Sequence, residues 1–250
     1  MTRVFLVRGM LVGILAGLLS FGFLKLYGEP QVDRAIAFET QLDEAKAATE
    51  RAKGLKVEEE PELVSRRVQS SIGLFTAVIV YCTAFGGLFG LAFAFAYGRV
   101  DSALTPQGVS VLLAATGFIA IYLIPNLKYP ANPPAVGDPE TIGERTALYF
   151  IMIALSIAAV VAAIALRRFI VPQFGEWNAT LLAAASYLIL VAVAGFLLPP
   201  INEVPDEFPA VVLWNFRIAS IGAQLIMWGT FGLLFGSLTE RAFASVRPRA

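Results

Sequence analysis

Long blocks of apolar residues limit what this chain can fold into. Six blocks stand out: Val4–Leu26, Ser71–Tyr97, Gly108–Pro125, Thr146–Leu166, Thr180–Leu198 and Pro209–Leu238. A helix needs roughly 20 residues to cross the hydrocarbon core of a bilayer, and each block approaches or exceeds that length. A membrane-spanning strand would instead alternate apolar and polar residues, which these blocks do not. The sequence therefore predicts an all-α, polytopic integral membrane protein, a bundle of six transmembrane helices.

The composition narrows the classes of function. The 250 residues are 57% hydrophobic and carry no net charge, so the chain has no general attraction to nucleic acid. It has one cysteine, Cys82, and no histidine. Phosphate-binding P-loop, HExxH zinc and GxSxG nucleophile motifs are absent from the sequence. We therefore expect no enzymatic activity, no bound cofactor and no nucleic-acid partner.

The distribution of basic residues predicts the orientation in the membrane. Arginine and lysine are enriched in short cytoplasmic loops. With the N-terminus in the cytoplasm, six crossings return the C-terminus there. The inner segments then carry more basic than acidic residues. The basic residues are Arg3, Arg8, Arg99, Arg167, Arg168, Arg241, Arg247 and Arg249, and the acidic ones are Asp101, Glu176 and Glu240. The first block is expected to be a retained helix, since "LKLYGEP" after it lacks a small-x-small cleavage pattern. We expect a multi-pass protein of the inner (plasma) membrane, with both termini cytoplasmic.

A long polar segment, residues 28–70, separates the first helix (residues 1–27) from the five-helix remainder (residues 71–250). Pro30 can start a helix and Gly54 can stop one. The residues between them are rich in Ala, Glu and Lys, which predicts an amphipathic helix on the outer side, packed on the membrane domain or on a partner. The acidic run "VEEEPE" that follows is either a solvated linker or a cation-collecting patch.

Two predicted outer loops share a pattern. "PPAVGDPE" (Pro133–Glu140) and "PPINEVPD" (Pro199–Asp206) both read Pro-Pro, four residues, Pro, acid. Each is followed by an arginine near the start of an apolar block, Arg145 and Arg217 respectively. The chain is either built from repeated helical hairpins or shows a coincidence among residues common in membrane proteins.

Acids at these loops are candidate ligands for a cation at the outer mouth of a polar path, namely Asp138, Glu140, Glu203 and Asp206. Arg145, Arg217 and Gln224 are candidate gating or ion-pairing residues. Ionisable groups within a membrane mark pathways by default, which applies to the two arginines, and Gln224 follows Arg217 by two turns on the same helix face. A structural alternative stays open. Arg217 then pairs with Glu203, Asp206, Glu207 or Glu144 in a rigid turn stiffened by proline.

Glycines recur at four-residue intervals in several apolar blocks. They are Gly9, Gly13 and Gly17 in the first, Gly86 and Gly90 in the second, and Gly232 and Gly236 in the last. Small residues at this spacing let two helices approach closely. The pattern predicts tight helix packing in the bundle.

Three stretches resemble the CbtA family of bacteria, the predicted cobalt transporter subunit: "GEPQVDRAIAFE" (Gly28–Glu39), "LKYPANPPAVGDPETIGERTALY" (Leu127–Tyr149) and "LPPINEVPDEFPAVVLWNFR" (Leu198–Arg217). The resemblance extends over essentially the whole chain. It implies an inner-membrane protein that acts with a small one-helix, histidine-containing subunit, CbtB, and is linked to cobalamin biosynthesis.

The sequence and this resemblance together predict a permease subunit for uptake of a divalent transition-metal cation, with cobalt as cargo rather than cofactor. Cobalt favours imidazole and mixed nitrogen and oxygen ligands, whereas this chain offers carboxylates and carbonyls. Either the CbtB-like partner supplies histidines or the ion passes partly hydrated. A second copy of the chain is a further candidate partner. The alternatives are a non-transporting scaffold or accessory subunit that binds a partner through residues 28–70, and transport of another solute such as a cobalamin precursor.

Overall fold

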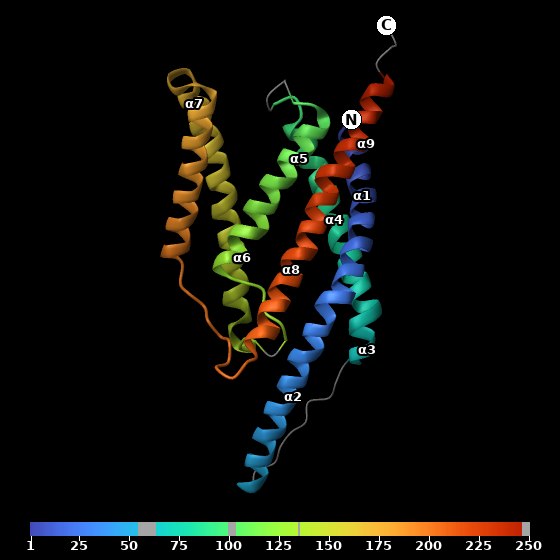
Figure 1. Ribbon diagram of the computed structural model, residues 1–250, viewed down its shortest axis with the longest axis vertical. Helices are drawn as coiled ribbons and strands as arrows, with labels where there is room; N and C mark the ends of the chain where they lie inside the picture. Colours follow the sequence, from blue (N-terminus) through green and yellow to red (C-terminus); the bar gives the residue numbers. More distant parts are fainter. Residues whose placement is uncertain (55–63, 100–103, 135, 247–250) are drawn as a thin grey trace. The chain divides into compact units, whose positions relative to one another are not determined.

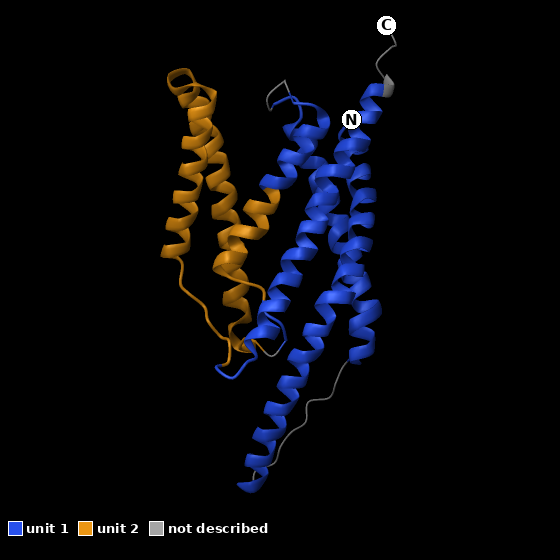
Figure 2. Ribbon diagram, viewed as in Figure 1, with its two compact units in different colours: residues 1–116, 132–135, 206–250 blue, residues 117–131, 136–205 orange. Residues whose placement is uncertain are grey.

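The computed structural model describes residues 1–54, 64–99, 104–134 and 136–246, and these ranges contain helices but no strands. The acidic run at 57–62 lies outside the described residues. The chain forms two compact units (Figure 2). Unit 1 comprises Met1–Thr116, Asn132–Ala135 and Asp206–Ala250, and unit 2 comprises Gly117–Ala131 and Val136–Pro205. The prediction of an all-α fold is confirmed.

Unit 1 begins with a helix far longer than the first apolar block. Helix α1 (Thr2–Phe23), the π-helical turn η1 (Leu24–Gly28) and α2 (Glu29–Ala52) form one continuous helix of 51 residues (Figure 1). The widened turn comes directly before Pro30, which has no backbone N–H to donate and whose ring would crowd the preceding turn. The polar helix expected between Pro30 and Gly54 is thus a direct extension of the first apolar helix.

The second helix packs on the first through glycines. It consists of α3 (Arg66–Val68), η2 (Gln69–Gly73) and α4 (Leu74–Ala96). A Cβ atom on Gly9 would overlap the carbonyl oxygen of Gly86, and one on Gly90 would overlap that of Phe5. The close packing predicted from the glycine spacing is confirmed here, since backbone lies against backbone between α1 and α4.

Two further helical segments contribute to unit 1. Helices α5 (Pro106–Gly117) and α6 (Ile124–Lys128) are joined by the π-helical turn η3 (Phe118–Leu123). Of this segment, only α5 up to Thr116 lies in unit 1. Helices α8 (Ala210–Thr230) and α9 (Gly236–Val246) are joined by the π-helical turn η5 (Phe231–Phe235). Added Cβ atoms on Gly232 and Gly236 would lie 3.0 and 2.9 Å from side chains of α5, so these glycines also mark a close approach. Aromatic rings fill the core, with Phe93 and Phe235 centroids 5.1 Å apart.

Unit 2 is built mainly from α7 (Ile142–Leu197), a helical segment of 56 residues preceded by the short 3-10 helix η4 (Pro139–Thr141). The helix is interrupted at Gly175, whose φ of 76° and ψ of 166° are not helical. Figure 1 shows the chain doubling back there, so α7 consists of two arms, residues 142–174 and 176–197. Buried residues of both arms pack with α6 and the residue after it, and they include Tyr129, Met152 and Val191.

Among the described residues, five helices are long and apolar enough to cross a membrane: Thr2–Ala52, Arg66–Ala96, Pro106–Lys128, Pro139–Leu197 and Ala210–Ala244. The polytopic membrane character is confirmed. The fourth of these helices contains two of the six predicted apolar blocks, one in each arm of α7. The helices also extend beyond the predicted blocks, because polar residues at a membrane surface can continue a helix that hydropathy alone would end.

Candidate functional site: two proline-rich loops

The candidate residues cluster around two loops. Loop A is residues 129–141, between α6 and α7, and loop B is residues 198–209, between α7 and α8. The candidates are divided between the two units. Unit 2 holds Asp138, Glu140, Arg145 and Glu203, whereas unit 1 holds Asp206, Arg217 and Gln224.

Glu203 of loop B is the most heavily bonded of the candidate acids. Its Oε1 accepts a hydrogen bond from the Thr141 hydroxyl at 2.6 Å, and its Oε2 accepts one from the Asp138 backbone N–H at 2.8 Å. Arg145 Nε lies 3.2 Å from the same Oε2, and the two side chains are 25% and 19% exposed. The Thr141 hydroxyl, then the Asp138 N–H and the charge of Arg145 lower the pKa of Glu203 against the opposing effect of burial. Glu203 is therefore held as a carboxylate.

Arg145 is fixed by the backbone of loop A as well as by Glu203. Its Nη2 donates to the Asp138 carbonyl oxygen at 3.0 Å. Gly137 has a φ of +122°, and a Cβ atom there would overlap the Arg145 guanidinium. The Asp138 carboxylate in turn accepts from the Glu140 backbone N–H at 2.9 Å and so caps η4. Loop A thus places the arginine against the carboxylate of loop B.

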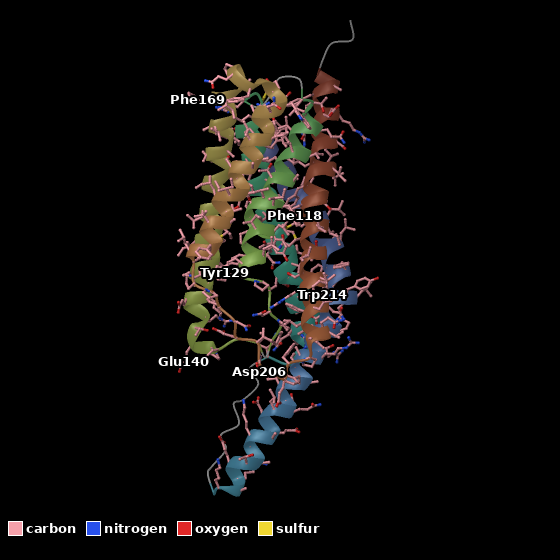
Figure 3. The ribbon with its side chains drawn as sticks, turned by 60° about the vertical axis from the view of Figure 1, so that its left-hand side comes forward. Phe118, Tyr129, Glu140, Phe169, Asp206 and Trp214 are labelled. Atoms are coloured by element: carbon pink, nitrogen blue, oxygen red, sulfur yellow. The ribbon has the colours of Figure 1, made fainter. Side chains whose placement is uncertain are left out.

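The remaining candidate acids are exposed. Glu140 lies at the opposite end of unit 2 from Phe169 (Figure 3), and Asp206 precedes α8 in unit 1. Within the described parts of the chain, no three His, Cys, Asp or Glu side chains are grouped closely enough to hold a metal ion. Within unit 2, the structure brings Glu203 to the Asp138 backbone, while Asp206 belongs to unit 1. The role of the four acids as metal ligands stays a prediction.

In unit 1, Arg217 of α8 donates from Nη2 to Asn132 Oδ1 of loop A at 2.9 Å. The sequence had suggested four carboxylates as partners and did not single out this amide. Seven residues further along α8, Gln224 Nε2 lies 3.4 Å from the Tyr81 hydroxyl of α4. Arg217 and Gln224 therefore have different partners, one at a loop and one between two helices.

Comparison with known proteins decides the family. A family model described as "Probable cobalt transporter subunit (CbtA)" matches residues 2–240. The chain belongs to the CbtA family. Neither a curated protein nor a solved structure gives a significant match. The resemblance inferred from the sequence is confirmed, and it assigns this multi-pass membrane protein to a family of transporter subunits, which is not a class of enzymes.

The two arginines of this CbtA chain each contact the loop that lies farther away in sequence. Arg145, which follows loop A, pairs with Glu203 of loop B. Arg217, which follows loop B, bonds Asn132 of loop A. Tyr129 adds a third link, because its hydroxyl donates to the Pro199 carbonyl oxygen at 2.9 Å. The repeated Pro-acid pattern therefore gives two loops, each of which is contacted by the arginine that follows the other loop.

A second ion-pair cluster of the CbtA chain was missed by the sequence reasoning. Arg66, at the start of the second helix, pairs with Glu29 and lies 2.9 Å from Asp33 Oδ1 through its Nη2. Glu29 is buried, at 8% exposed, and Asp33 follows it by one helical turn. The two acids directly after an apolar helix could have indicated an ion pair. Their partner Arg66, however, lies 37 residues after Glu29 in the sequence.

Proposed function

We propose that this chain is the membrane permease subunit that takes up a divalent transition-metal cation, cobalt, across the inner membrane and so supplies cobalamin biosynthesis. The observation that carries the proposal is the family match over residues 2–240, whose description is a probable cobalt transporter subunit. The apolar helices provide the membrane body that such a subunit needs. The membrane potential drives a cation inward, by about 2.3 kcal/mol per charge per 100 mV.

The proposed topology has six crossings and both termini in the cytoplasm. Each arm of α7 is long enough to cross, and the reversal at Gly175 would bring Arg167, Arg168 and Glu176 to the cytoplasmic surface. Arg8 of α1 donates to Thr239 of α9 at 2.9 Å, so the first and last helices of unit 1 meet near the two chain termini. That contact supports an even number of crossings.

The proposed mechanism begins at the outer loops. Asp138, Glu140, Glu203 and Asp206 attract the cation, and Arg145 competes with it for Glu203. The ion pair at 3.2 Å supports this role, because a divalent cation must displace the guanidinium before it can use the carboxylate. Arg217 and Gln224 act further along α8. A CbtB-like one-helix subunit supplies the imidazoles that cobalt favours and this chain lacks, and a second copy of the chain completes the assembly.

Uptake of labelled cobalt by vesicles containing the reconstituted protein tests the proposal, with and without the one-helix partner. We expect Glu203→Gln and Asp206→Asn each to reduce uptake several-fold. Glu39→Gln is the matched control, because it removes one exposed acid of α2 outside the two loops. Uptake that stays unchanged in the loop variants, where the wild type transports, would contradict a cation path at these loops. Competition by other metals and by cobalamin precursors distinguishes the cargo.

A second candidate function is that of an accessory subunit that does not itself transport. The continuous helix Thr2–Ala52 favours it, because Arg66 fixes the start of α2 while the later part of α2 exposes most of its side chains. A partner docked there would be held rigidly to the membrane domain. In this case charge reversal at Asp43 and Glu44 would abolish co-purification of the partner, and the loop variants would leave uptake unchanged.

A further inference from the structure

A groove with two arginines lies near the termini of unit 1, far along α1 from α2. It has a volume of about 620 Å³ and is lined by Arg3, Val4, Val7, Arg8, Leu11 and Leu238. The five α1 residues recur at spacings that place them on one face of the helix. Leu238 of α9 forms the opposite wall. The groove therefore combines two guanidinium groups with an apolar surface in one unit.

Among the described residues, no carboxylate pairs with the two arginines of this groove. Arg8 Nη1 donates to Thr239 Oγ1 at 2.9 Å, and Thr239 is fully buried, so the arginine is held in place by a neutral partner. A guanidinium carries five N–H donors, and this contact uses one of them. The neighbouring carboxylate of Glu240 is turned to the start of α5, where its Oε2 accepts from the Gln107 backbone N–H at 3.1 Å. The part of the chain that the structure describes contributes no acid to the lining of the groove.

The apolar part of the groove is exposed on the protein surface. Val4 is 57% exposed and Leu11 is 62% exposed, and both lie on the α1 face that carries the arginines. Arginine binds phosphate through paired, charge-assisted hydrogen bonds, whereas aliphatic side chains favour hydrocarbon. A ligand that matches both parts has a phosphate group at one end and an acyl chain at the other.

We infer that this groove binds an anionic phospholipid, with its phosphate on Arg3 and Arg8 and an acyl chain along Val4, Val7, Leu11 and Leu238. Basic pockets beside transmembrane helices are suited to anionic head groups, which are abundant on the cytoplasmic leaflet. The groove faces that leaflet under the topology proposed above. The inference itself needs only that unit 1 is embedded in a membrane, so it is independent of the cargo.

Native mass spectrometry of the full-length protein, exchanged into vesicles of equal phosphatidylglycerol and phosphatidylcholine, tests the inference. We expect the wild type to retain phosphatidylglycerol in preference to phosphatidylcholine. Arg3→Gln should lower that preference about fivefold, as expected for one arginine near a charged lipid surface. Arg3 is exposed, so its replacement does not threaten folding. Arg8→Lys keeps the positive charge of the second arginine and should lower the preference less than Arg3→Gln.

Arg241→Gln is the matched control, because it removes one exposed arginine of α9 that does not line the groove. It should leave lipid retention unchanged. Equal retention of the two lipids by the wild type would overturn the inference, and so would equal loss of the preference in Arg3→Gln and Arg241→Gln. Loss of a co-purified one-helix subunit in Arg3→Gln, with lipid retention intact, would assign the groove to that protein instead.

Discussion

At the scale of single residues, the charged groups near the apolar helices have defined partners. Glu203 accepts two hydrogen bonds and forms an ion pair with Arg145. Arg66 pairs with Glu29 and Asp33. A charge placed at the edge of a membrane without such partners is costly. The contacts of Glu203 also make it responsive, because protonation or a competing cation would remove its stabilisation. A structural ion pair and the proposed gate would therefore use the same contacts.

The lowered pKa of Glu203 predicts how stability depends on pH. Because its pKa is lower in the folded protein than the usual value near 4.5, Glu203 stabilises the fold above that value, and this contribution is lost as the pH falls through the folded pKa. We expect Glu203→Gln to lower the Tm of the detergent-purified protein at pH 7, and the difference from wild type to shrink below about pH 4. Thermal unfolding measured from pH 7 to pH 3.5 checks this.

Glu140→Gln is the control for the pH series, because it removes an exposed carboxylate from the other loop. It should leave the Tm at pH 7 close to that of the wild type. A difference between wild type and Glu203→Gln that is constant over the whole pH range would mean that the carboxylate charge is not what Thr141, Asp138 and Arg145 recognise.

At the scale of elements, backbone contact between α1 and α4 organises unit 1. The four-residue glycine spacing was readable from the sequence, because only small residues permit that approach. The continuity of α1 with α2 could not be predicted from the sequence, because hydropathy falls at Lys25 and Glu29 while the helix continues through them. The same holds in α7, where Arg167 and Arg168 lie in a helical arm beyond the end of the predicted block. Hydropathy locates lipid-facing residues, whereas helix ends depend on backbone geometry.

The glycine contact gives a sharp test. Gly86→Ala adds a methyl group that would overlap the Gly9 carbonyl oxygen, so α1 and α4 must separate. Overpacking of this kind costs about 1–3 kcal/mol. Gly22→Ala is the control on α1, because a Cβ atom there meets nothing within 4 Å. We expect a lower Tm for Gly86→Ala and an unchanged or slightly higher Tm for Gly22→Ala. Equal effects would show that glycine's backbone freedom, rather than helix contact, is responsible.

The reversal at Gly175 makes a separate prediction for α7. With φ at 76° and ψ at 166°, the residue occupies a region that is open almost solely to glycine. Gly175→Ala should destabilise unit 2 by about 1–3 kcal/mol, measured by limited proteolysis of the detergent-purified protein as faster cleavage between the arms. Gly195→Ala, where a Cβ atom meets nothing within 4 Å, should be cleaved at the wild-type rate. Wild-type cleavage of Gly175→Ala would mean that the reversal tolerates another backbone conformation.

At the scale of the whole molecule, the sequence was sufficient for the fold class and for the family, but it did not reveal the pairing of the loops. The prolines and acids of loops A and B were recognised from their unusual spacing. Their partners were not, because Arg217 and Asn132 are 85 residues apart, and such a contact follows from how helices assemble rather than from local periodicity. The division of the candidate residues between two units was equally invisible, since neighbouring positions such as Pro205 and Asp206 belong to different units.

Accessibility of single cysteines tests the six-crossing topology. Cys82 is buried, so Asp206→Cys and Trp177→Cys each introduce a reactive thiol at an exposed position. If both arms of α7 cross the membrane, position 206 lies outside and position 177 inside. A membrane-impermeant maleimide added to intact cells should then label Asp206→Cys, whereas Trp177→Cys should react after the membrane is opened. The wild type is the control for labelling at Cys82. Labelling of both variants from outside would mean that α7 does not cross twice, and labelling of Asp206→Cys from the cytosol alone would place the acids on the wrong side to collect an external cation.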